Sequence, residues 1–500
     1  MKLLKKLLPS FVVIFLSSWA IKPLLYSGFF PIHDDTQVAR VFEMAKSLKM
    51  GIFPVRWVPD LGYGLGYPIF NFYAPLSYYA GSIFNLIGFD ALIATKIMMG
   101  FGIILSGIFM YLFAKELFGK IGAVVAALFY VYAPYHALDI YVRGDVAEFW
   151  AYAFIPLVFY GLWKVYKNQS WIFVIISSIG YAGVILSHNL TAMMVTPFLL
   201  LYILFLTIAS YRKKQKKAII YLLSGLSLGV VISCFYWLPA LMEMKNTNVL
   251  SQIGGGANFL DHFVCFNQLW SSQWAYGGSA PGCTDGFSFM VGKLHILISL
   301  ASIAGVSLLI VLNKHKQEAE KLLITVICFL GFILSIFLTL EISKSIWQTV
   351  PLMPFFQFPW RFLIMVSFFS SVLAGAFVWL ATFLPIKKHF PHFVFELSAL
   401  LILALLFLNI KFFIPQKFLY ISSNYYTNEY NLKWTTSKIS DEYLPKDTKK
   451  PKNANEAILN KQIFIFKETP IEQAANLISI SGIGILFIGI ILSGKKHYGK

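Results

Sequence analysis

The sequence predicts an all-α polytopic membrane protein, and three observations support this class. Of the 500 residues, 58% are apolar and only 13% are charged, whereas about a quarter of the residues of an average soluble protein are charged. Apolar runs close to the ~20 residues that an α-helix needs to cross a bilayer recur along most of the chain. Lys and Arg gather in short clusters between these runs. This composition excludes a soluble globular enzyme.

We expect about twelve transmembrane helices, because each apolar run approaches the length that a bilayer requires. The stretch at 68–88 is also apolar, but prolines and a glycine interrupt it, so it is expected to be interfacial or re-entrant, or to span. The predicted spans are residues 7–27, 91–114, 121–138, 147–166, 171–187, 190–210, 218–241, 291–312, 321–341, 362–384, 393–411 and 476–493.

The first run resembles a secretory signal, because it follows basic residues and contains the small-x-small triplet Ser18-Trp19-Ala20. Its apolar character continues to Tyr26, towards a full bilayer length. We therefore expect a retained transmembrane helix, with cleavage as the alternative.

The net charge of +18 comes largely from these basic clusters. We interpret the clusters as signals of membrane topology and not as a surface that binds nucleic acid. They occur in roughly every second connection, as the positive-inside rule predicts for cytoplasmic loops, so both termini should be cytoplasmic. The longer segments 28–90, 242–290, 342–361 and 412–475 then face outside. Because functional groups concentrate on loops held by a rigid scaffold, we expect a multi-pass plasma-membrane protein whose active face is extracytoplasmic.

Three parts follow from this topology. A transmembrane domain with three outer loops covers 1–411, a small extracytoplasmic subdomain covers 412–475, and the last helix with a basic cytoplasmic tail covers 476–500. The subdomain is polar, and we expect it to be partly ordered, with Gln462 to Phe466 as a strand.

Two of the four cysteines, Cys265 and Cys283, share one outer loop. A disulfide can persist in an oxidising compartment, and closing this loop would contribute roughly 3 kcal/mol. We expect the bridge, with two unpaired thiols as the alternative.

The first outer loop carries the strongest functional signal, because His33-Asp34-Asp35 follows the first span directly. Two adjacent carboxylates at a membrane boundary cost free energy unless they are ion-paired or hydrated, so such a pair is retained mainly where it has a function. Apolar residues then repeat at helical spacing from Val38 to Leu48, which predicts an amphipathic interfacial helix with Asp35 or Thr36 as its N-cap. An ionised carboxylate there can accept a proton from a hydroxyl nucleophile or bind a divalent cation. The alternative is that the two acids only cap the helix.

A run of Gly, Pro and aromatic residues follows, from Pro54 to Pro75, and it includes Trp57. Such a run cannot form a regular helix, so we expect an irregular loop stabilised by its own packing. Its aromatic faces could stack on a sugar or a lipid, or could form an interfacial aromatic belt.

The order of these features resembles the GT-C superfamily of membrane glycosyltransferases. More narrowly, five segments resemble the bacterial family of "6-pyruvoyl-tetrahydropterin synthase-related" polytopic membrane proteins. The segments are His33-Asp34-Asp35, Pro54-Val55-Arg56-Trp57-Val58-Pro59-Asp60, Gly62-Tyr63-Gly64, Phe356-Gln357-Phe358-Pro359-Trp360-Arg361-Phe362 and Glu442-Tyr443-Leu444-Pro445. The pterin label does not fit the chemistry, because a pterin synthase is a soluble zinc enzyme and this chain has no histidine cluster typical of that site.

The superfamily resemblance implies a hexosyl or pentosyl transferase that moves a sugar from a polyprenyl-phosphate donor to an acceptor glycan, lipid or protein on the outer face. Asp34 or Asp35 would be the general base. Some members of the superfamily use a divalent ion, so Mg²⁺ or Mn²⁺ is a possible cofactor, and membrane lipids are expected partners.

A departing phosphate needs cationic or hydrogen-bonding groups. The candidates are Arg56, Arg143, Lys293 and Arg361, together with His33 and Trp57 near the acids. Each arginine could instead extend to lipid headgroups. His188, near the outer end of its span, is expected to be a hydrogen-bonded packing residue.

Two other functions remain open. A transporter or flippase of lipid-linked glycans would place ionisable residues near the bilayer midplane, whereas these spans carry few charges away from their ends. A non-catalytic protein of envelope assembly is the third possibility.

Overall fold

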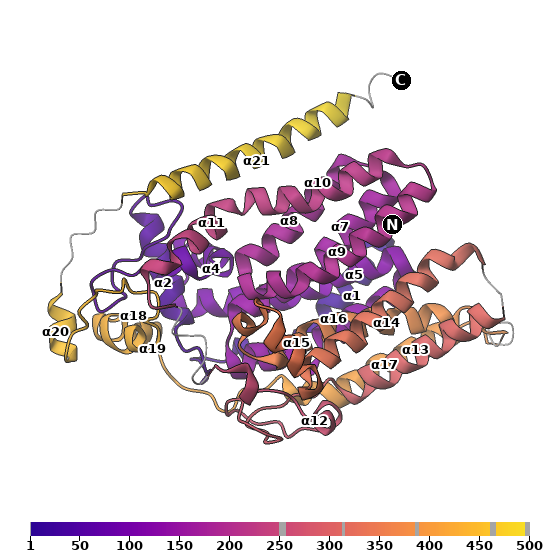
Figure 1. The fold of residues 1–500 in the computed structure, drawn as a ribbon. Coiled ribbons are helices and arrows are strands. Elements are labelled where there is room, and N and C mark those ends of the chain that lie inside the picture. Colours follow the sequence, from indigo (N-terminus) through magenta and orange to yellow (C-terminus); the bar gives the residue numbers. More distant parts are fainter. Residues whose placement is uncertain (1, 250–256, 313–315, 386–389, 461–466, 496–500) are drawn as a thin grey trace. The chain divides into compact units, whose positions relative to one another are not determined.

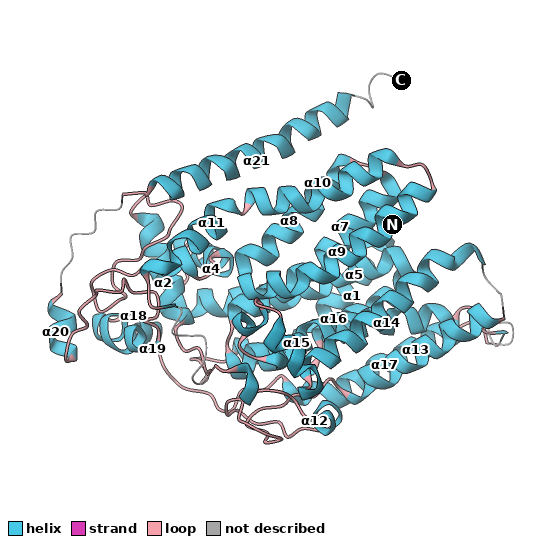
Figure 2. Ribbon diagram, in the orientation of Figure 1, coloured by secondary structure: helices cyan, strands magenta, loops and turns pink. Residues whose placement is uncertain are grey.

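The computed structural model describes residues 2–249, 257–312, 316–385, 390–460 and 467–495, and the regular secondary structure in these ranges is helical (Figure 1, Figure 2). Extended pairing within them is confined to isolated bridges such as Val58 with Tyr67. The strand predicted for Gln462 to Phe466 lies outside the described residues, as do the glycines at 254–256.

Nine helices among the described residues are long and apolar enough to cross a membrane, and one bent pair would make a tenth. The pair consists of Lys216–Ile232 and Cys234–Asn246, which meet at 61°. The nine are Leu7–Leu25, Ala91–Val131, Val146–Asn168, Asn189–Arg212, Lys293–Val311, Ala319–Thr339, Pro359–Ala381, Phe393–Phe412 and Pro470–Leu492. The part of the chain that the structure describes is therefore helical and has fewer candidate spans than the twelve expected.

Helix α5 (Ala91–Val131) accounts for part of this difference. Its 41 residues would measure about 62 Å if straight, twice the hydrocarbon thickness. The backbone breaks at Gly119, where φ is 76°. A Cβ placed on Gly107 would lie 3.0 Å from a Val131 methyl, although a straight helix would separate these residues by about 36 Å. The helix therefore folds back at Gly119, and the predicted spans 91–114 and 121–138 fall on its two halves.

The predicted span 171–187 coincides with α8 (Trp171–Ser187), which at 17 residues is a shorter apolar helix. The twelve-helix topology and the sidedness of the loops remain predictions.

The chain forms two compact units, each assembled from three segments. Unit 1 comprises residues 1–23, 102–143 and 256–416, and in it α16 (Leu363–Ala381) packs against α13 (Lys293–Val311) and α14 (Ala319–Thr339). The other α-helices of unit 1 are α1 (Lys2–Ile21), residues 102–131 of α5, α6 (Pro134–Leu138), α12 (Phe266–Trp270), α15 (Lys344–Thr349) and α17 (Phe393–Asn409). The Cys265–Cys283 disulfide is present in this unit.

Unit 2 comprises residues 24–101, 144–255 and 417–500. Helix α8 packs against α7 (Val146–Asn168) and α10 (Lys216–Ile232), and α21 (Pro470–Lys495) packs against α10 and α11 (Cys234–Glu243). The other α-helices are α2 (Gln37–Lys49), α3 (Ile69–Phe72), α4 (Leu76–Leu86), residues 91–101 of α5, α9 (Asn189–Arg212), α18 (Ser423–Thr427), α19 (Ser437–Ile439) and α20 (Ala454–Leu459). The predicted boundaries at 411 and 475 stay a prediction.

Helix α2 is the helix predicted for the first outer loop, and Thr36 is its N-cap. The expectation that its polar face meets water or lipid headgroups is wrong for Arg40 and Glu43, which are only 4% and 0% exposed, whereas Lys49 is exposed. Helix α2 packs against α4, and Glu43 accepts a hydrogen bond from the Asp60 backbone amide at 2.9 Å. Neighbouring protein segments therefore cover the part of the polar face that carries Arg40 and Glu43.

Candidate active site

The acidic loop is held against the start of α7 through one glycine. Gln37 donates a hydrogen bond to the Gly144 carbonyl at 2.7 Å, and a Cβ on Gly144 would lie 2.5 Å from the Ile32 side chain. Gly144 has a φ of 67°, a conformation that residues with a side chain rarely adopt. Ile32 and Gln37 flank Asp34 and Asp35, so the segment that carries both acids is held against the beginning of α7.

Helix α7 begins at an acidic cap. The Asp145 side chain accepts a hydrogen bond from the Glu148 amide at 3.0 Å, which satisfies one of the free amides of the first turn. The i, i+3 spacing places Asp145 and Glu148 on the same face of that turn. His188 joins them from the junction between α8 and α9.

Asp145, Glu148 and His188 are buried, with exposures of 4%, 0% and 7%, and one potential ligand atom from each lies within 4.8 Å of the others. His188 Nδ1 is 2.8 Å from the Thr191 hydroxyl, a contact that orients the imidazole. Two carboxylates and an imidazole at this separation could bind a divalent metal ion. Two acids that close repel each other, and a cation would offset the repulsion.

Two tyrosines connect this group with the first outer loop. Burial raises the pKa of Tyr78 to about 12; Arg40 offsets part of the increase, and Asp145 and Asp34 add to it. Burial is also the main cause of the high pKa of Tyr73, with further increases from Asp145 and Asp34. Asp34 and Asp145 therefore act on the same pair of phenols.

Arg40 supports these tyrosines from the other side. Its guanidinium carbon lies 4.5 Å from the centre of the Tyr73 ring, and it donates to the Tyr78 hydroxyl at 3.3 Å and to Ser440 at 3.0 Å. Tyr78 in turn donates to Gln37 at 2.6 Å. A continuous chain of contacts thus runs from the C-terminal segment to the loop that carries the acids.

Asp35 is half-buried and lies beside Tyr426 of α18. Burial raises its pKa to about 6, and the Tyr426 hydroxyl offsets part of that increase. A carboxylate with this pKa is mostly ionised at neutral pH and is still basic enough to accept a proton. His33 is exposed, and Trp57 is half-buried.

Arg56 lies in a buried polar network and is only 1% exposed. It donates to the Phe235 carbonyl at 2.6 Å and to Asn476 at 2.8 Å, and its Nε lies 3.5 Å from Glu472. Burial lowers its pKa, and the nearby carboxylates, first Glu472, oppose that change. These contacts connect the first outer loop with α11 and α21, and contact of Arg56 with substrate stays a prediction.

The Gly-rich loop after Arg56 packs against the C-terminal segment. Tyr63 donates through its amide to Ser437 at 3.0 Å and through its hydroxyl to Asp441 at 2.8 Å. The Tyr443 amide donates to the Tyr67 hydroxyl at 3.3 Å. Two of the segments that carry the family resemblance, Gly62-Tyr63-Gly64 and Glu442-Tyr443-Leu444-Pro445, therefore meet in space. Sequence reasoning expected an irregular loop here but attributed its stability to its own packing.

The remaining predicted cations belong to unit 1. Arg143 pairs with Asp139 and lies 4.7 Å from the centre of the Trp360 ring. Arg361 is 8% exposed and lies 5.4 Å from the centre of the Phe358 ring. Lys293 is exposed at the start of α13. Their contact with substrate stays a prediction.

His188 is buried and hydrogen-bonded as expected, but its grouping with Asp145 and Glu148 was not predicted from the sequence. A signal was present, because all three residues lie where predicted spans end or begin, at 138–148 and 187–190. Under the predicted topology these breaks face outside, so two acids and a histidine at neighbouring outer ends were a candidate cluster.

Comparison with known proteins identifies the family. Residues 70–416 match the model of the family described as "6-pyruvoyl-tetrahydropterin synthase related domain; membrane protein". The chain belongs to this family. An uncharacterized protein of Lactococcus lactis subsp. cremoris (strain MG1363) is 27% identical over 243 residues, which cover 47% of this family member and 39% of the relative.

Solved structures show the fold. The oligosaccharyltransferase of Archaeoglobus fulgidus, solved with a tethered acceptor peptide containing the NVT sequon, is similar with a TM-score of 0.51 and 13% identity. The similarity covers 83% of this chain and 55% of the oligosaccharyltransferase, so the family member spans about half its length. The arabinofuranosyltransferase AftD from Mycobacteria has a TM-score of 0.46 and 12% identity, over 84% of this chain and 28% of that one. The fold is GT-C-like by its similarity to the oligosaccharyltransferase.

Proposed function

We propose that this protein transfers a sugar from a polyprenyl-phosphate donor to an acceptor hydroxyl on the extracytoplasmic face of the membrane. The observation that carries the proposal is the anchoring of Asp34 and Asp35 beside Asp145 through Gly144. It brings acids suited to proton transfer next to a buried group suited to a metal ion. The GT-C-like fold supports the same reaction class.

One carboxylate of the first outer loop is the general base. It accepts the proton of the acceptor hydroxyl while the oxygen forms a bond to the anomeric carbon, and the bond from that carbon to the lipid phosphate oxygen breaks. The phosphate leaves with the bonding pair, and the configuration inverts. Asp34 fits this role because it acts on Tyr73 together with Asp145, and Asp35 fits it by its pKa of about 6.

Asp145, Glu148 and His188 would hold a divalent cation. Oxygen ligands suit both Mg²⁺ and Mn²⁺, and the imidazole favours Mn²⁺. When bound, the ion supplies positive charge that stabilises the departing phosphate. The protein contributes the orientation of the ligands, through the Glu148 amide on Asp145 and through Thr191 on His188.

The metal proposal is testable without turnover. Electron paramagnetic resonance of Mn²⁺ added to the metal-stripped protein should report a bound ion in the wild type. Glu148→Gln should weaken binding at least tenfold, because it removes one charged ligand. Asp447→Asn, which changes an exposed carboxylate of the C-terminal segment, is the matched control and should bind as the wild type does. Equal binding by all three proteins would exclude the ion from this group.

The function itself is tested by release of polyprenyl phosphate from radiolabelled lipid-linked sugars in nanodiscs. We expect Asp34→Asn or Asp35→Asn to lower the rate by about 10²-fold or more, the usual contribution of a general base, and Asp447→Asn to leave it within about twofold. Equal release by all variants would exclude a catalytic base in this loop. Sugar flux into sealed vesicles that survives in both loop variants would instead indicate a transporter.

A further inference from the structure

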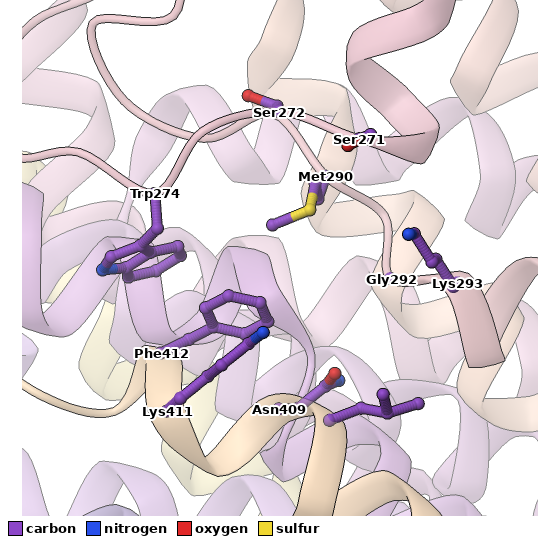
Figure 3. Close-up of a pocket in the computed structure, with 10 residues that line it drawn as sticks. Ser271, Ser272, Trp274, Met290, Gly292, Lys293, Asn409, Lys411 and Phe412 are labelled. Atoms are coloured by element: carbon purple, nitrogen blue, oxygen red, sulfur yellow. The ribbon is translucent and has the colours of Figure 1, made fainter.

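Unit 1 contains a pocket of about 410 Å³ that lies outside the group of acids in unit 2 (Figure 3). It is bounded by the segment after α12, by the start of α13 and by the end of α17. Trp274 and Phe412 form one wall, with ring centres 4.8 Å apart. The volume is in the range of pockets that bind small molecules.

Two lysines give this pocket a positive charge. Lys293 and Lys411 are both exposed, and their side chains extend toward the space between Met290 and Phe412 (Figure 3). Their ammonium groups lie 5.6 and 5.3 Å from the centres of the Trp270 and Phe412 rings. Neither lysine has a carboxylate partner among the residues that the structure describes. The residues that line the pocket therefore include two cations and no acid, and the nearby Asp285 carboxylate accepts hydrogen bonds from Gln268, Ser272 and the Gln273 amide.

The other polar groups of the pocket have defined partners. Ser272 donates to Asp285 at 2.7 Å, and Asn409 donates to the Tyr132 carbonyl at 2.9 Å. Ser271 adds an exposed hydroxyl to the lining. These hydrogen bonds hold the lining side chains of Ser272 and Asn409 in place, so the pocket is formed before a ligand binds.

The pocket lies at the ends of two candidate spans. Lys293 is the first residue of Lys293–Val311, and Phe412 is the last residue of Phe393–Phe412. Span ends lie at the boundary where lipid headgroups meet water. Aromatic rings and lysines at this level suit a molecule with an apolar body and an anionic head.

We propose that this pocket binds the phosphate ester of an anionic membrane lipid, with the phosphate between the two ammonium groups and the adjoining carbons against Trp274 and Phe412. The lipid is favoured over a soluble phosphate because the site combines an aromatic wall with a position at the membrane boundary. This inference goes beyond the proposed function, because it assigns a second ligand site and does not require sugar transfer.

The test uses the full-length protein in detergent, titrated with phosphatidylglycerol and followed by native mass spectrometry. The double variant Lys293→Gln with Lys411→Gln should bind this lipid at least tenfold more weakly than the wild type. The control variant Lys344→Gln with Lys417→Gln makes the same change in charge at exposed lysines outside the pocket, and it should bind as the wild type does. Equal binding by the pocket variant and the control would overturn the proposal.

Two further measurements complete the test. One separates the effect of lost charge from an effect on folding, and the other separates binding of a lipid from binding of a free phosphate ester. The double variant Lys293→Arg with Lys411→Arg keeps both charges and should retain binding, and a loss equal to that of the Gln variant would contradict the charge argument. Phosphatidylcholine should bind no more strongly to the wild type than to the Gln variant. Complete competition by glycerol 3-phosphate at a concentration equal to that of the lipid would show that the site selects a soluble phosphate ester, which would also overturn the proposal.

Discussion

Gly144→Ala is a sharp perturbation of the candidate site, because this glycine joins the acidic loop to α7. The substitution places a methyl group on a residue with φ of 67°, at a cost of roughly 1–2 kcal/mol. The new Cβ would also lie 2.5 Å from the Ile32 side chain, and such overpacking costs about 1–3 kcal/mol. The free energy of unfolding should therefore fall by about 2–5 kcal/mol.

The same change should disturb the site itself. If Ile32 moves to accept the methyl group, Asp34 and Asp35 move with it, and a displacement of about 1 Å can lower a rate by roughly 10²-fold. The assays are denaturant unfolding in detergent and release of polyprenyl phosphate.

A double variant and a matched control make this prediction specific. Adding Ile32→Ala to Gly144→Ala should relieve only part of the steric loss, because the Cβ that alanine keeps would still lie 2.7 Å from the new methyl group. It should relieve none of the part that comes from φ. Gly278→Ala, at a glycine whose Cβ would meet nothing within 4 Å, should leave stability unchanged or slightly increased. The reasoning is refuted if Gly144→Ala is as stable and as active as Gly278→Ala.

Three further predictions concern other parts of the molecule. Arg56→Ala should lower the free energy of unfolding by about 3–5 kcal/mol, because it leaves Glu472 buried without its cation; unfolding by denaturant checks this, and an unchanged midpoint would contradict it. Burial raises the pKa of Asp35 from 3.8 to about 6, so a role as base predicts turnover that falls as the pH drops through 6. The neutral carboxyl favours the folded state, and this stabilisation is lost as the pH rises from 3.8 to 6. A pH profile of turnover and of unfolding checks both, and Asp35→Asn should remove the part of each profile that Asp35 contributes. Replacing Cys265 and Cys283 by Ser should cost about 3 kcal/mol for a separation of 18 residues, measured as a lower unfolding midpoint that equals that of the reduced wild type.

The sequence predicts local elements well where periodicity decides them. The apolar spacing after Val38 places α2, and Gly51 marks its end. The same pattern gave the wrong environment for Arg40, because its partner Ser440 is 400 positions away and no local signal indicates that contact. The contacts of the C-terminal segment with residues 28–90, such as that of Ser440 with Arg40, were likewise not predicted, and the expected subdomain 412–475 stays a prediction.

The candidate site could be predicted only in part. Asp34 and Asp35 stood out because two acids follow an apolar span directly. Asp145, Glu148 and His188 did not, because the group forms only when α7, α8 and α9 bring the starts and ends of different spans together. Distances between such span ends depend on helix packing, which a charge pattern does not specify.

The most direct test of the central claim is single-turnover release of polyprenyl phosphate by the purified protein, with the transferred sugar counted in the same sample. We predict one phosphate released for each sugar transferred by the wild type, and a rate at least about 10²-fold lower when Asp34 and Asp35 are both changed to Asn. Wild-type rates in that double variant, with metal binding unchanged, would contradict the assignment of proton transfer to the first outer loop.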